Sequence, residues 1–523
     1  MPRYPLHDIG KFGLISDIKG HELPPEALYD GRNIRMQDNY VTNFQSYREV
    51  GGTKLHSTKK LFYVPFAGEK YWLYANETDV GVWKTSANTH HALTRASGDY
   101  TMTSNDQWNG FWLNGVWIMN NGVDKPQFWA DGNVATKLAD LTNWPATWKA
   151  KVLRGYKNFA LAMDITKSST RYKSLISWSH PADPGAVPSS WDITDPTKLT
   201  GDISLAQTSG QIVDACTLRE ANIIYKTDAI IMQQYVGGND IFAWREISNI
   251  TGAMGQQCAV EFQPGQHLVL TSDGDVVLMN GQTLVSVASR RILYAIRSEV
   301  SLNVANKSFL VAYPERKEVW VCFVNSYGIG EEPYVSSAFV WNWESGAWGR
   351  SPALFAFDAA SGVLEEDPTS PTDSERLKGT ILAANVDGET WYQHDVSSYA
   401  GGVADASYFT TQALSFGGQK QDGSPAVDFN QHKVLTEIWP NVEISGAEVL
   451  VSIKAADEAE YLTLSTNYQD FVWVPSESPK IDCCIDGKYF QIEFFFYPAG
   501  ELVEYSYKLF GFRFEFNLSG EYP

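Results

Sequence analysis

The residues best equipped to bind a ligand are four tryptophans in one short stretch, "QWNGFWLNGVWIMNNGVDKPQFWADG". Indole rings can stack on sugars, particularly with Asp and Asn nearby. In all-β proteins the same rings pack neighbouring sheets together, and the strand-like pattern around them favours that use. The stretch therefore predicts buried packing rings and leaves a sugar platform as the alternative. The four residues are Trp108, Trp112, Trp117 and Trp129.

Other groups that could do chemistry lack the companions a site needs. His90 and His91 in "ANTHHALT" would need further ligands to hold a metal, so a solvated polar turn is the simpler interpretation. The "SDGDV" stretch at 272–276 lacks most of a calcium-loop ligand series, and a hairpin turn explains it. Two of the 61 acidic residues could face each other across a glycosidase pocket, but no local motif identifies the pair.

Sequence motifs of the common enzyme classes are also missing. The chain has no Walker-type phosphate loop, no His-Glu-x-x-His, no Gly-x-Ser-x-Gly and no dinucleotide-binding Gly-x-Gly-x-x-Gly after a strand. The sequence therefore predicts no catalytic, cofactor-binding or metal-binding residues and no cofactor. We expect a protein that is not an enzyme.

Composition narrows the class of protein. The 523 residues carry a net charge of -20, the wrong sign for holding nucleic acid phosphates but suited to a passage through which DNA slides without sticking. Acidity that only maintains solubility is an equally good explanation. Five scattered cysteines and an N-terminus without an apolar signal indicate a chain made in a reducing cytoplasm. No stretch is long and apolar enough to span a bilayer.

The elements that must position these residues are mostly short strands. Runs of four to eight residues rich in Val, Ile, Phe, Tyr and Trp end in turn chemistry, and Asn-Gly or Asp-Gly occurs ten times. Helical spacing appears only at 288–301, where Ile292, Ala295, Ile296 and Val300 share a face, and in "PATWKAKVL" after Trp144. The predicted fold class is all-β: a degenerate β-propeller followed by a C-terminal β-sandwich, with few short helices.

The domain boundaries follow from composition. We expect residues 1–50 to form an N-terminal arm and first hairpin, 51–396 a propeller-like body, and 397–523 the sandwich. An irregular segment near 166–210 interrupts the body, either as an excursion with a role in a channel or subunit contact, or as an ordinary surface loop. Residues 365–375 indicate an exposed loop and 397–408 a linker. In "VWNWESGAW", large rings are expected to wedge between blades: Trp341, Trp343 and Trp348.

An ordered series of stretches resembles the tail hub or nozzle proteins of short-tailed bacteriophages, the tail tubular protein B group. The resemblance covers most of residues 10–350, and the last 120 residues match in kind. Three stretches carry the resemblance, and the third, at 223–260, matches the family most specifically. It is followed by an Asp-Gly pair, an Asn-Gly pair and a helix that begins with arginine. The matching residues are Leu23, Pro24, Ala27, Asn33 and Arg35; then Trp178, Ser179, Asp183, Pro184 and Trp191; then Tyr235 to Gly238, Phe242, Gly252 and Ala253.

This resemblance implies a structural virion protein. Such proteins form a ring, usually sixfold, below the adaptor on the portal, extend the DNA ejection channel, help to close it until infection, and carry fibres or spikes. The expected partners are copies of the chain itself, an adaptor, tail fibres or spikes, and DNA in passage, and the expected location is the virion tail, assembled in the host cytoplasm. Two alternatives stay open: another virion connector (stopper, head-completion or fibre-attachment protein) and a carbohydrate-binding or carbohydrate-active propeller.

Overall fold

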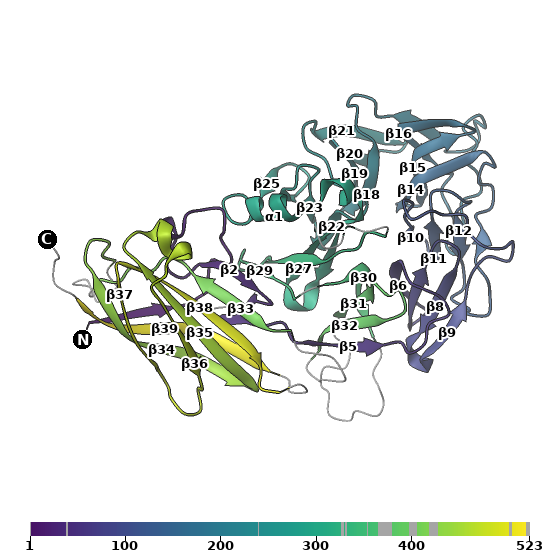
Figure 1. Cartoon of the computed structure of the whole chain (residues 1–523). Helices are drawn as coiled ribbons and strands as arrows, with labels where there is room; N and C mark the ends of the chain where they lie inside the picture. Colours follow the sequence, from purple (N-terminus) through teal and green to yellow (C-terminus); the bar gives the residue numbers. More distant parts are fainter. Residues whose placement is uncertain are drawn as a thin grey trace.

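The computed structural model describes residues 2–37, 40–238, 240–325, 329, 332–352, 354–364, 379–396, 405–417, 427–500 and 505–518. These residues form a β-propeller and a β-sandwich that stand side by side (Figure 1). The all-β fold class predicted from the sequence is confirmed. No helix in this part of the chain combines the length and the apolar character needed to cross a membrane.

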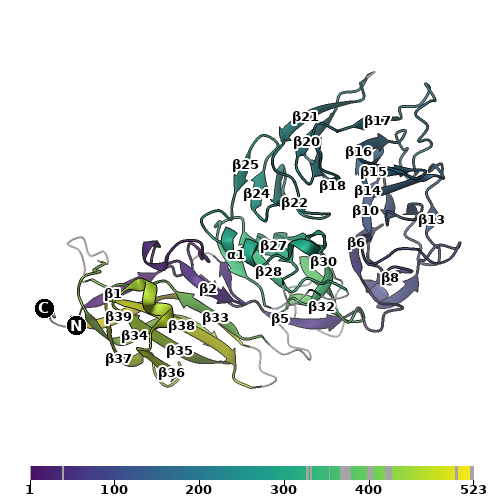
Figure 2. The same cartoon turned by 45° about the horizontal axis from the view of Figure 1, so that its top comes forward.

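Seven four-stranded antiparallel sheets, counted over the described residues, follow one another around a common axis as the blades of the propeller (Figure 2). The blades are blade 1, β6 (Lys60–Phe66), β7 (Glu69–Ala75), β8 (Val80–Lys84) and β9 (Thr89–Ala92); blade 2, β10 (Asn109–Leu113), β11 (Val116–Asn120), β12 (Gln127–Trp129) and β13 (Ala139–Asp140); blade 3, β14 (Trp148–Tyr156), β15 (Phe159–Lys167), β16 (Thr170–Trp178) and β17 (Gly201–Ser204); blade 4, β18 (Ile212–Leu218), β19 (Ala221–Lys226), β20 (Ile230–Tyr235) and β21 (Phe242–Ser248); blade 5, β22 (Ala259–Gln263), β23 (Gln266–Leu270), β24 (Val276–Met279) and β25 (Leu284–Ser286); blade 6, β26 (Phe309–Tyr313), β27 (Glu318–Phe323), β28 (Ser337–Asn342) and β29 (Trp348–Arg350); and blade 7, β30 (Ala356–Val363), β31 (Gly379–Asn385), β32 (Trp391–Val396) and β5 (Ser46–Val50).

Turn chemistry explains why the blades are made of tight hairpins. Asn114 and Gly115 join β10 to β11 with φ values of 50° and 89°. A two-residue type I′ turn needs positive φ at both positions, which Asn and Gly tolerate best. The predicted strand series from 266 to 286 is likewise confirmed as β23, β24 and β25.

The last blade contains a strand from the beginning of the chain. β5 pairs antiparallel with β32, with Val50 opposite Trp391 and Glu49 opposite Tyr392. This pairing closes the propeller, because blade 7 then lies between blade 6 and blade 1 and shares side-chain packing with both. A closed ring leaves no open edge between its first and last sheets.

The sandwich is also built from both ends of the chain. One sheet contains β1 (Arg3–His7), β3 (Arg35–Gln37), β4 (Tyr40–Thr42), β34 (Lys433–Ser445), β37 (Ile481–Gly487) and β39 (Ser506–Leu518), and the other contains β2 (Leu28–Arg32), β33 (Ser407–Thr411), β35 (Ala447–Ala456), β36 (Tyr468–Trp473) and β38 (Tyr489–Pro498). The segment expected as an arm, residues 1–50, thus supplies four strands to the sandwich and one to the propeller. Rings from the two sheets stack in its core, with Phe496 and Tyr507 3.9 Å apart and Phe494 and Phe512 4.9 Å apart.

Helices in the described residues are short. The helix expected at 288–301 is present as α1 (Leu293–Glu299), and Ile292, Ile296 and Val300 are buried along the predicted face. The other helical elements of the described residues are short 3-10 helices: η1 (Gly20–Glu22), η2 (Thr85–Ala87), η3 (Leu302–Lys307), η4 (Pro314–Arg316) and η5 (Ala459–Leu464).

The second predicted helix, after Trp144, is wrong. Only Pro145 to Trp148 form a turn, and the chain continues as β14. The chain forms a strand here because burial alternates with a period of two residues. Ala150 and Val152 are buried whereas Lys149 is exposed, as expected when every second side chain faces the same side of a sheet.

The irregular segment near 166–210 contains two strands, β16 and β17, joined by a long loop. Trp191 in that loop is buried against Trp144, with ring centroids 4.9 Å apart, so an indole anchors the loop to the propeller. The loop expected at 365–375 lies outside the described residues, as does 397–404 of the expected linker, while β33 begins at Ser407.

Candidate functional site

The first strand of each blade lies nearest the propeller axis. β6, β10, β14, β18, β22, β26 and β30 follow one another around the centre of the ring (Figure 2). Polar side chains at the ends of these inner strands therefore face the axis or the neighbouring inner strand. The axis is the candidate functional site because side chains from most blades converge there.

Ion pairs link neighbouring blades along the axis. Each pair joins a cation on one inner strand to a carboxylate on the next inner strand or, for Asp106, in the loop before it. The pairs are Lys60 Nζ–Asp358 Oδ1 (2.7 Å, blades 1 and 7), Lys151 Nζ–Asp106 Oδ1 (2.7 Å, blades 3 and 2) and Arg154 Nη2–Asp214 Oδ1 (2.6 Å, blades 3 and 4). These ion pairs tie blade 1 to blade 7 and blade 3 to blades 2 and 4.

Asp358 sits at the junction where the ring closes. Its carboxylate accepts hydrogen bonds from Lys60 Nζ and from the backbone N–H of Leu61 at 2.8 Å. Burial raises the pKa of Asp358, and the ammonium of Lys60 opposes that rise. The pair therefore holds blade 7 against blade 1 through a desolvated contact.

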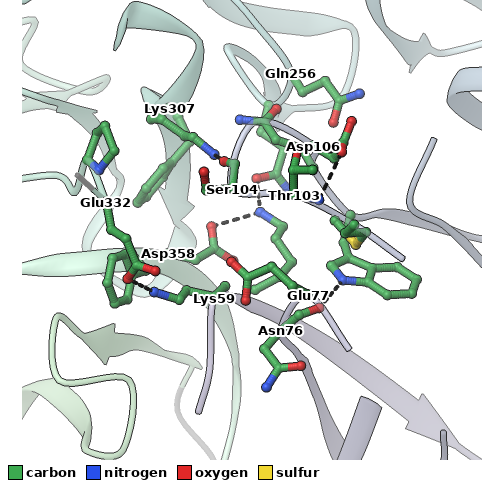
Figure 3. Close-up of a pocket in the computed structure, with 18 of the residues that line it drawn as sticks. Lys59, Asn76, Glu77, Thr103, Ser104, Asp106, Gln256, Lys307, Glu332 and Asp358 are labelled. Atoms are coloured by element: carbon green, nitrogen blue, oxygen red, sulfur yellow. Dashed lines mark hydrogen bonds and ion pairs between the residues drawn. The ribbon is translucent and has the colours of Figure 1, made fainter. Parts of the chain in front are cut away.

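A cavity of about 80 Å³ opens beside this pair (Figure 3). Its lining comes from blades 1, 2, 5, 6 and 7, and Lys59, Lys307, Glu77 and Glu332 supply charges around it. Lys307 donates a hydrogen bond to the Ser104 carbonyl, and burial lowers its pKa. The cavity thus combines charged side chains with limited access to water.

The four tryptophans at 108–129 do not form a platform on which sugars could stack. Trp108, Trp117 and Trp129 are buried, and Trp112 is 37 % exposed. Trp117 packs on Phe62 at 5.5 Å and Trp129 on Tyr71 at 5.2 Å, so their rings join blade 2 to blade 1. The prediction that these indoles pack sheets together is confirmed.

The wedges predicted in "VWNWESGAW" are likewise found between blades. Trp341 and Trp343 of blade 6 both pack on Phe262 of blade 5, at 5.4 and 5.2 Å. Trp348 is fully buried and donates a hydrogen bond from Nε1 to the Val287 carbonyl at 2.9 Å. The fully buried ring is therefore Trp348, whereas Trp343 is only half-buried.

His90 and His91 lie in strand β9 and not in the solvated turn expected from the sequence, and His90 is packed among aromatic rings. His90 in β9 stacks on Trp83 at 6.0 Å and hydrogen-bonds to the Tyr74 hydroxyl at 3.1 Å, while His91 lies beside Thr89. Burial lowers the pKa of His90. Among the described residues there is no group of three or more His, Cys, Asp or Glu side chains placed to hold a metal ion. Asp273 and Gly274 form the predicted hairpin turn between β23 and β24.

A second cluster of charges lies where the sandwich meets the propeller. Arg35 of β3 is buried and contacts Glu318 of β27 (Nε–Oε1 2.7 Å) and Asp395 of β32 (Nη1–Oδ1 2.8 Å). Arg316 adds a second guanidinium to Asp395 at 3.0 Å, and Phe44 lies 4.2 Å from the Arg35 guanidinium. One arginine of the sandwich thus bridges two blades.

The electrostatics of this junction differ between its two carboxylates. Burial alone would raise the pKa of Asp395, but Arg35 and Arg316 outweigh it and lower the pKa to about 2. Burial raises the pKa of Glu318, which has Arg35 as its guanidinium partner. Of these two carboxylates, Asp395 is therefore the one that the folded structure holds more firmly ionised.

This shift predicts a pH dependence. The folded pKa of Asp395, about 2, lies below its ordinary value of 3.8, so the ionised carboxylate stabilises the fold above about pH 4. That contribution, roughly 2 kcal/mol, disappears as the pH falls from about 4 to about 2. Urea denaturation of wild type and Asp395→Asn should give a difference in stability that is large at about pH 6 and shrinks toward about pH 2.5. A difference independent of pH would contradict this assignment.

Sequence reasoning missed the axial and junction charges. Lys60 is the first residue of an inner strand, and Asp214 and Asp358 lie on two others. Acids and bases on the first strand of each blade form a usable signal, but only after the blades themselves have been assigned. Arg35 was singled out only by the resemblance.

The chain has distant structural likenesses among known proteins. No family model and no curated protein matches the chain. Among solved structures, a fungal alcohol oxidase of the AA5 family in complex with copper covers 90 % of this chain and 93 % of its own, at 9 % identity and a TM-score of 0.40. YCF48 from Cyanidioschyzon merolae covers 67 % of this chain and 99 % of its own, at 12 % identity and a TM-score of 0.37, and the AfRom2 CNH domain covers 69 % and 100 %, at 8 % and 0.34. These likenesses are to other proteins and transfer no activity to this chain.

Proposed function

We propose that the chain is a structural component of a bacteriophage tail, the nozzle or hub of a short-tailed phage, and that it is not an enzyme. In this proposal several copies form a ring, sixfold as the resemblance implies, that extends the DNA ejection channel below an adaptor and helps to close it until infection. The ring would also carry fibres or spikes.

The observation that carries the proposal is the position in the fold of the residues that match those of the nozzle proteins. Ala27, Asn33 and Arg35 are buried, and Arg35 lies at the junction between sandwich and propeller. Asn33 Nδ2 donates to the Asp405 carbonyl at 2.7 Å, and Gln412 Nε2 donates to the Pro24 carbonyl at 2.7 Å. The first matching stretch therefore contains Arg35, which ties the sandwich to blades 6 and 7, and residues that hold the N-terminal segment within the sandwich.

The other matching residues support the same interpretation because they pack blades together. Phe242 contacts Trp178 at 5.3 Å, which joins blade 4 to blade 3. The Ala253 N–H donates to the Lys226 carbonyl at 2.9 Å, where the chain passes from blade 4 to blade 5. A resemblance concentrated in the framework suits a protein whose task is to keep its shape.

The channel in this proposal lies between copies. DNA would pass through the middle of the ring of subunits. Six copies would carry 6 × (-20) = -120 formal charges at pH 7. A wall of that sign repels phosphates and suits DNA in transit.

A candidate ring contact is an apolar row on the outer face of the second sandwich sheet. The row runs across four strands in register: Val472 opposite Leu450, Leu450 opposite Phe495, and Phe495 opposite Tyr408. Val472 is 66 % exposed and Leu450 37 %, and β36 is the edge strand of its sheet. Exposed apolar rows on edge strands are typical of association surfaces.

The ring makes a direct prediction. Leu450→Asp/Val472→Asp should keep the monomer folded, since both side chains face solvent, but should prevent assembly by placing charges in the contact. Mass photometry and negative-stain imaging would compare the variant with wild type. Val285→Asp, an exposed apolar residue on the outer strand of blade 5, is the matched control and should assemble. A wild-type chain that stays monomeric at every concentration would contradict the nozzle proposal, and equal assembly of all three would remove this contact.

A further inference from the structure

The strand that closes the propeller leads into a cluster of aromatic and histidine side chains. β5 ends at Val50, and residues 51–58, called the connector from here on, run from it to β6 of blade 1 (Figure 1). Gly51 has a φ of 80°, and a Cβ at this position would lie 3.1 Å from a ring carbon of Trp391, so the connector starts directly against blade 7. Its far end is also held by blade 7, because Trp391 Nε1 donates to Thr58 Oγ1 at 3.0 Å. The connector is therefore the joint between the last blade and the first.

His90 of blade 1 reaches the connector, and its hydrogen bonds identify which nitrogen carries the hydrogen. Its Nε2 contacts the Gly51 carbonyl, which can only accept, so Nε2 is the donor. In the neutral ring Nδ1 is then an acceptor, and it lies 3.1 Å from the Tyr74 hydroxyl. The Tyr74 oxygen in turn accepts from the Leu55 N–H at 3.2 Å. Neutral His90 thus completes a series of hydrogen bonds that runs from the connector through Tyr74 and back to the connector.

Protonation of His90 breaks this series. A hydrogen on Nδ1 removes the acceptor of the Tyr74 O–H, and Tyr74 is fully buried, so solvent offers no replacement. The new positive charge also lies close enough to the Lys54 ammonium to be repelled by it. A buried donor without an acceptor and a second cation in a half-buried site both oppose the proton.

His56, in the connector itself, is also suited to the neutral form. Its Nδ1 donates to the Ser57 carbonyl at 2.8 Å, and its Nε2 is buried without a hydrogen-bond partner among the described residues. Its ring lies 4.6 Å from the ring of Tyr74. A hydrogen on Nε2 would be a buried donor with nothing to accept it. If both histidines were protonated, they and Lys54 would place positive charges around one buried tyrosine.

The surrounding charges set the pH range of this effect. The charged and titratable groups that act on the two histidines are Lys54, Asp79 and His91, with Glu49 and Asp387 acting on Lys54. Burial lowers the pKa of both histidines from the ordinary value of 6.5, and Lys54 adds to the shift at His90, whereas Asp79 opposes it in part at His56. The neutral rings therefore stabilise the closed propeller above about pH 6.5, and this contribution is lost as the pH falls below that value.

We propose that His56 and His90 form an acid-sensitive latch on the strand that closes the propeller. Near neutral pH the two neutral rings hold the connector between blade 7 and blade 1. In mild acid both rings are protonated, the hydrogen bond from Tyr74 to His90 is lost, and the contact between blades 7 and 1 opens while the sandwich stays folded. The latch lies within the propeller and does not depend on the nozzle proposal.

Hydrogen–deuterium exchange of the full chain, measured by mass spectrometry, tests the latch. Exchange at about pH 7.5 is compared with exchange at about pH 5, after correction for the intrinsic effect of pH on the exchange rate. We expect peptides from β5, the connector and β9 to exchange at least about tenfold faster in acid. Peptides from β35 and β38 of the sandwich should exchange equally at both pH values. His394, with a pKa lowered by burial to about 4, and Asp395, at about 2, do not titrate in this range.

Three variants locate the effect. His56→Gln/His90→Gln introduces side chains that stay neutral and still donate and accept, so this variant should lose the difference between the two pH values whatever its stability. His56→Gln alone changes a half-buried position and should show a smaller response than wild type. His91→Gln is the matched control, because it changes the next residue of β9, whose ring lies beside Thr89, and it should respond as wild type.

The latch is wrong if β5 and the connector exchange equally at both pH values, or if the double variant responds to acid as strongly as wild type. It is also wrong if acid accelerates exchange to the same extent throughout the chain. That last result would mean that acid destabilises the whole fold and not the closing contact.

Discussion

Arg35→Ala will lower the free energy of unfolding by about 3–5 kcal/mol. The substitution leaves Glu318 without its guanidinium and Asp395 with only Arg316, all in a buried site. Ionised carboxylates without partners are costly to bury, so the sandwich should also lose its hold on blades 6 and 7. We expect the single unfolding transition to separate into two, one for each domain, in urea denaturation followed by fluorescence and circular dichroism.

Two variants sharpen this test. Arg32→Ala removes an exposed arginine three residues away and should cost little. Arg35→Lys keeps the charge but cannot reach both carboxylates with a planar fork, so it should lie between wild type and alanine. If Arg35→Ala unfolds like Arg32→Ala, the junction does not depend on this cluster.

Trp348→Ala is expected to cost about 3–5 kcal/mol, the range for an emptied aromatic core site. Its ring is 0 % exposed, lies 6.4 Å from Trp341, and bonds to the Val287 carbonyl across the boundary of blades 5 and 6. Its backbone carbonyl also accepts a hydrogen bond from the Leu14 N–H at 2.8 Å, so a shift of β29 would disturb the N-terminal segment.

Trp343→Ala is the matched control for this prediction. The same side chain stands five residues earlier, is half-buried, and packs on Phe262. The sequence alone selects Trp343 as a core wedge, whereas burial assigns the larger loss to Trp348. Thermal and chemical denaturation should rank the two variants in that order, and equal losses would contradict the packing argument.

Local signals predicted much of the fold. The Asn-Gly and Asp-Gly turns identified hairpins such as β10–β11 and β23–β24, and the spacing of Ile292, Ile296 and Val300 identified α1. The stretch after Pro145 misled because Pro suits a first helical turn as well as the turn before β14. In such cases only an alternation of apolar and polar residues distinguishes a strand from a helix. That alternation is weak in β14, which begins with a mixture of Lys and Ala.

Long-range pairings were beyond local reasoning. The pairing of β5 with β32 joins residues more than three hundred positions apart, and the pairing of β1 with β39 joins the two ends of the chain. The axial ion pairs were equally hidden: with 61 acids and 41 bases, nothing local nominates Lys60 and Asp358 as partners. Only the closed ring brings them together.

The mixed origin of the sandwich has a consequence for biosynthesis. Its first strands leave the ribosome several hundred residues before their partners, because β2 pairs with β33, and β1 and β4 pair with β39. At 5–20 residues per second the wait is roughly 25–100 s. Until then β1 and β2 are unpaired and the β3–β4 hairpin lacks its neighbour β39, and premature termination anywhere in the propeller leaves them so. Chaperones and proteases could use those open edges to recognise incomplete copies.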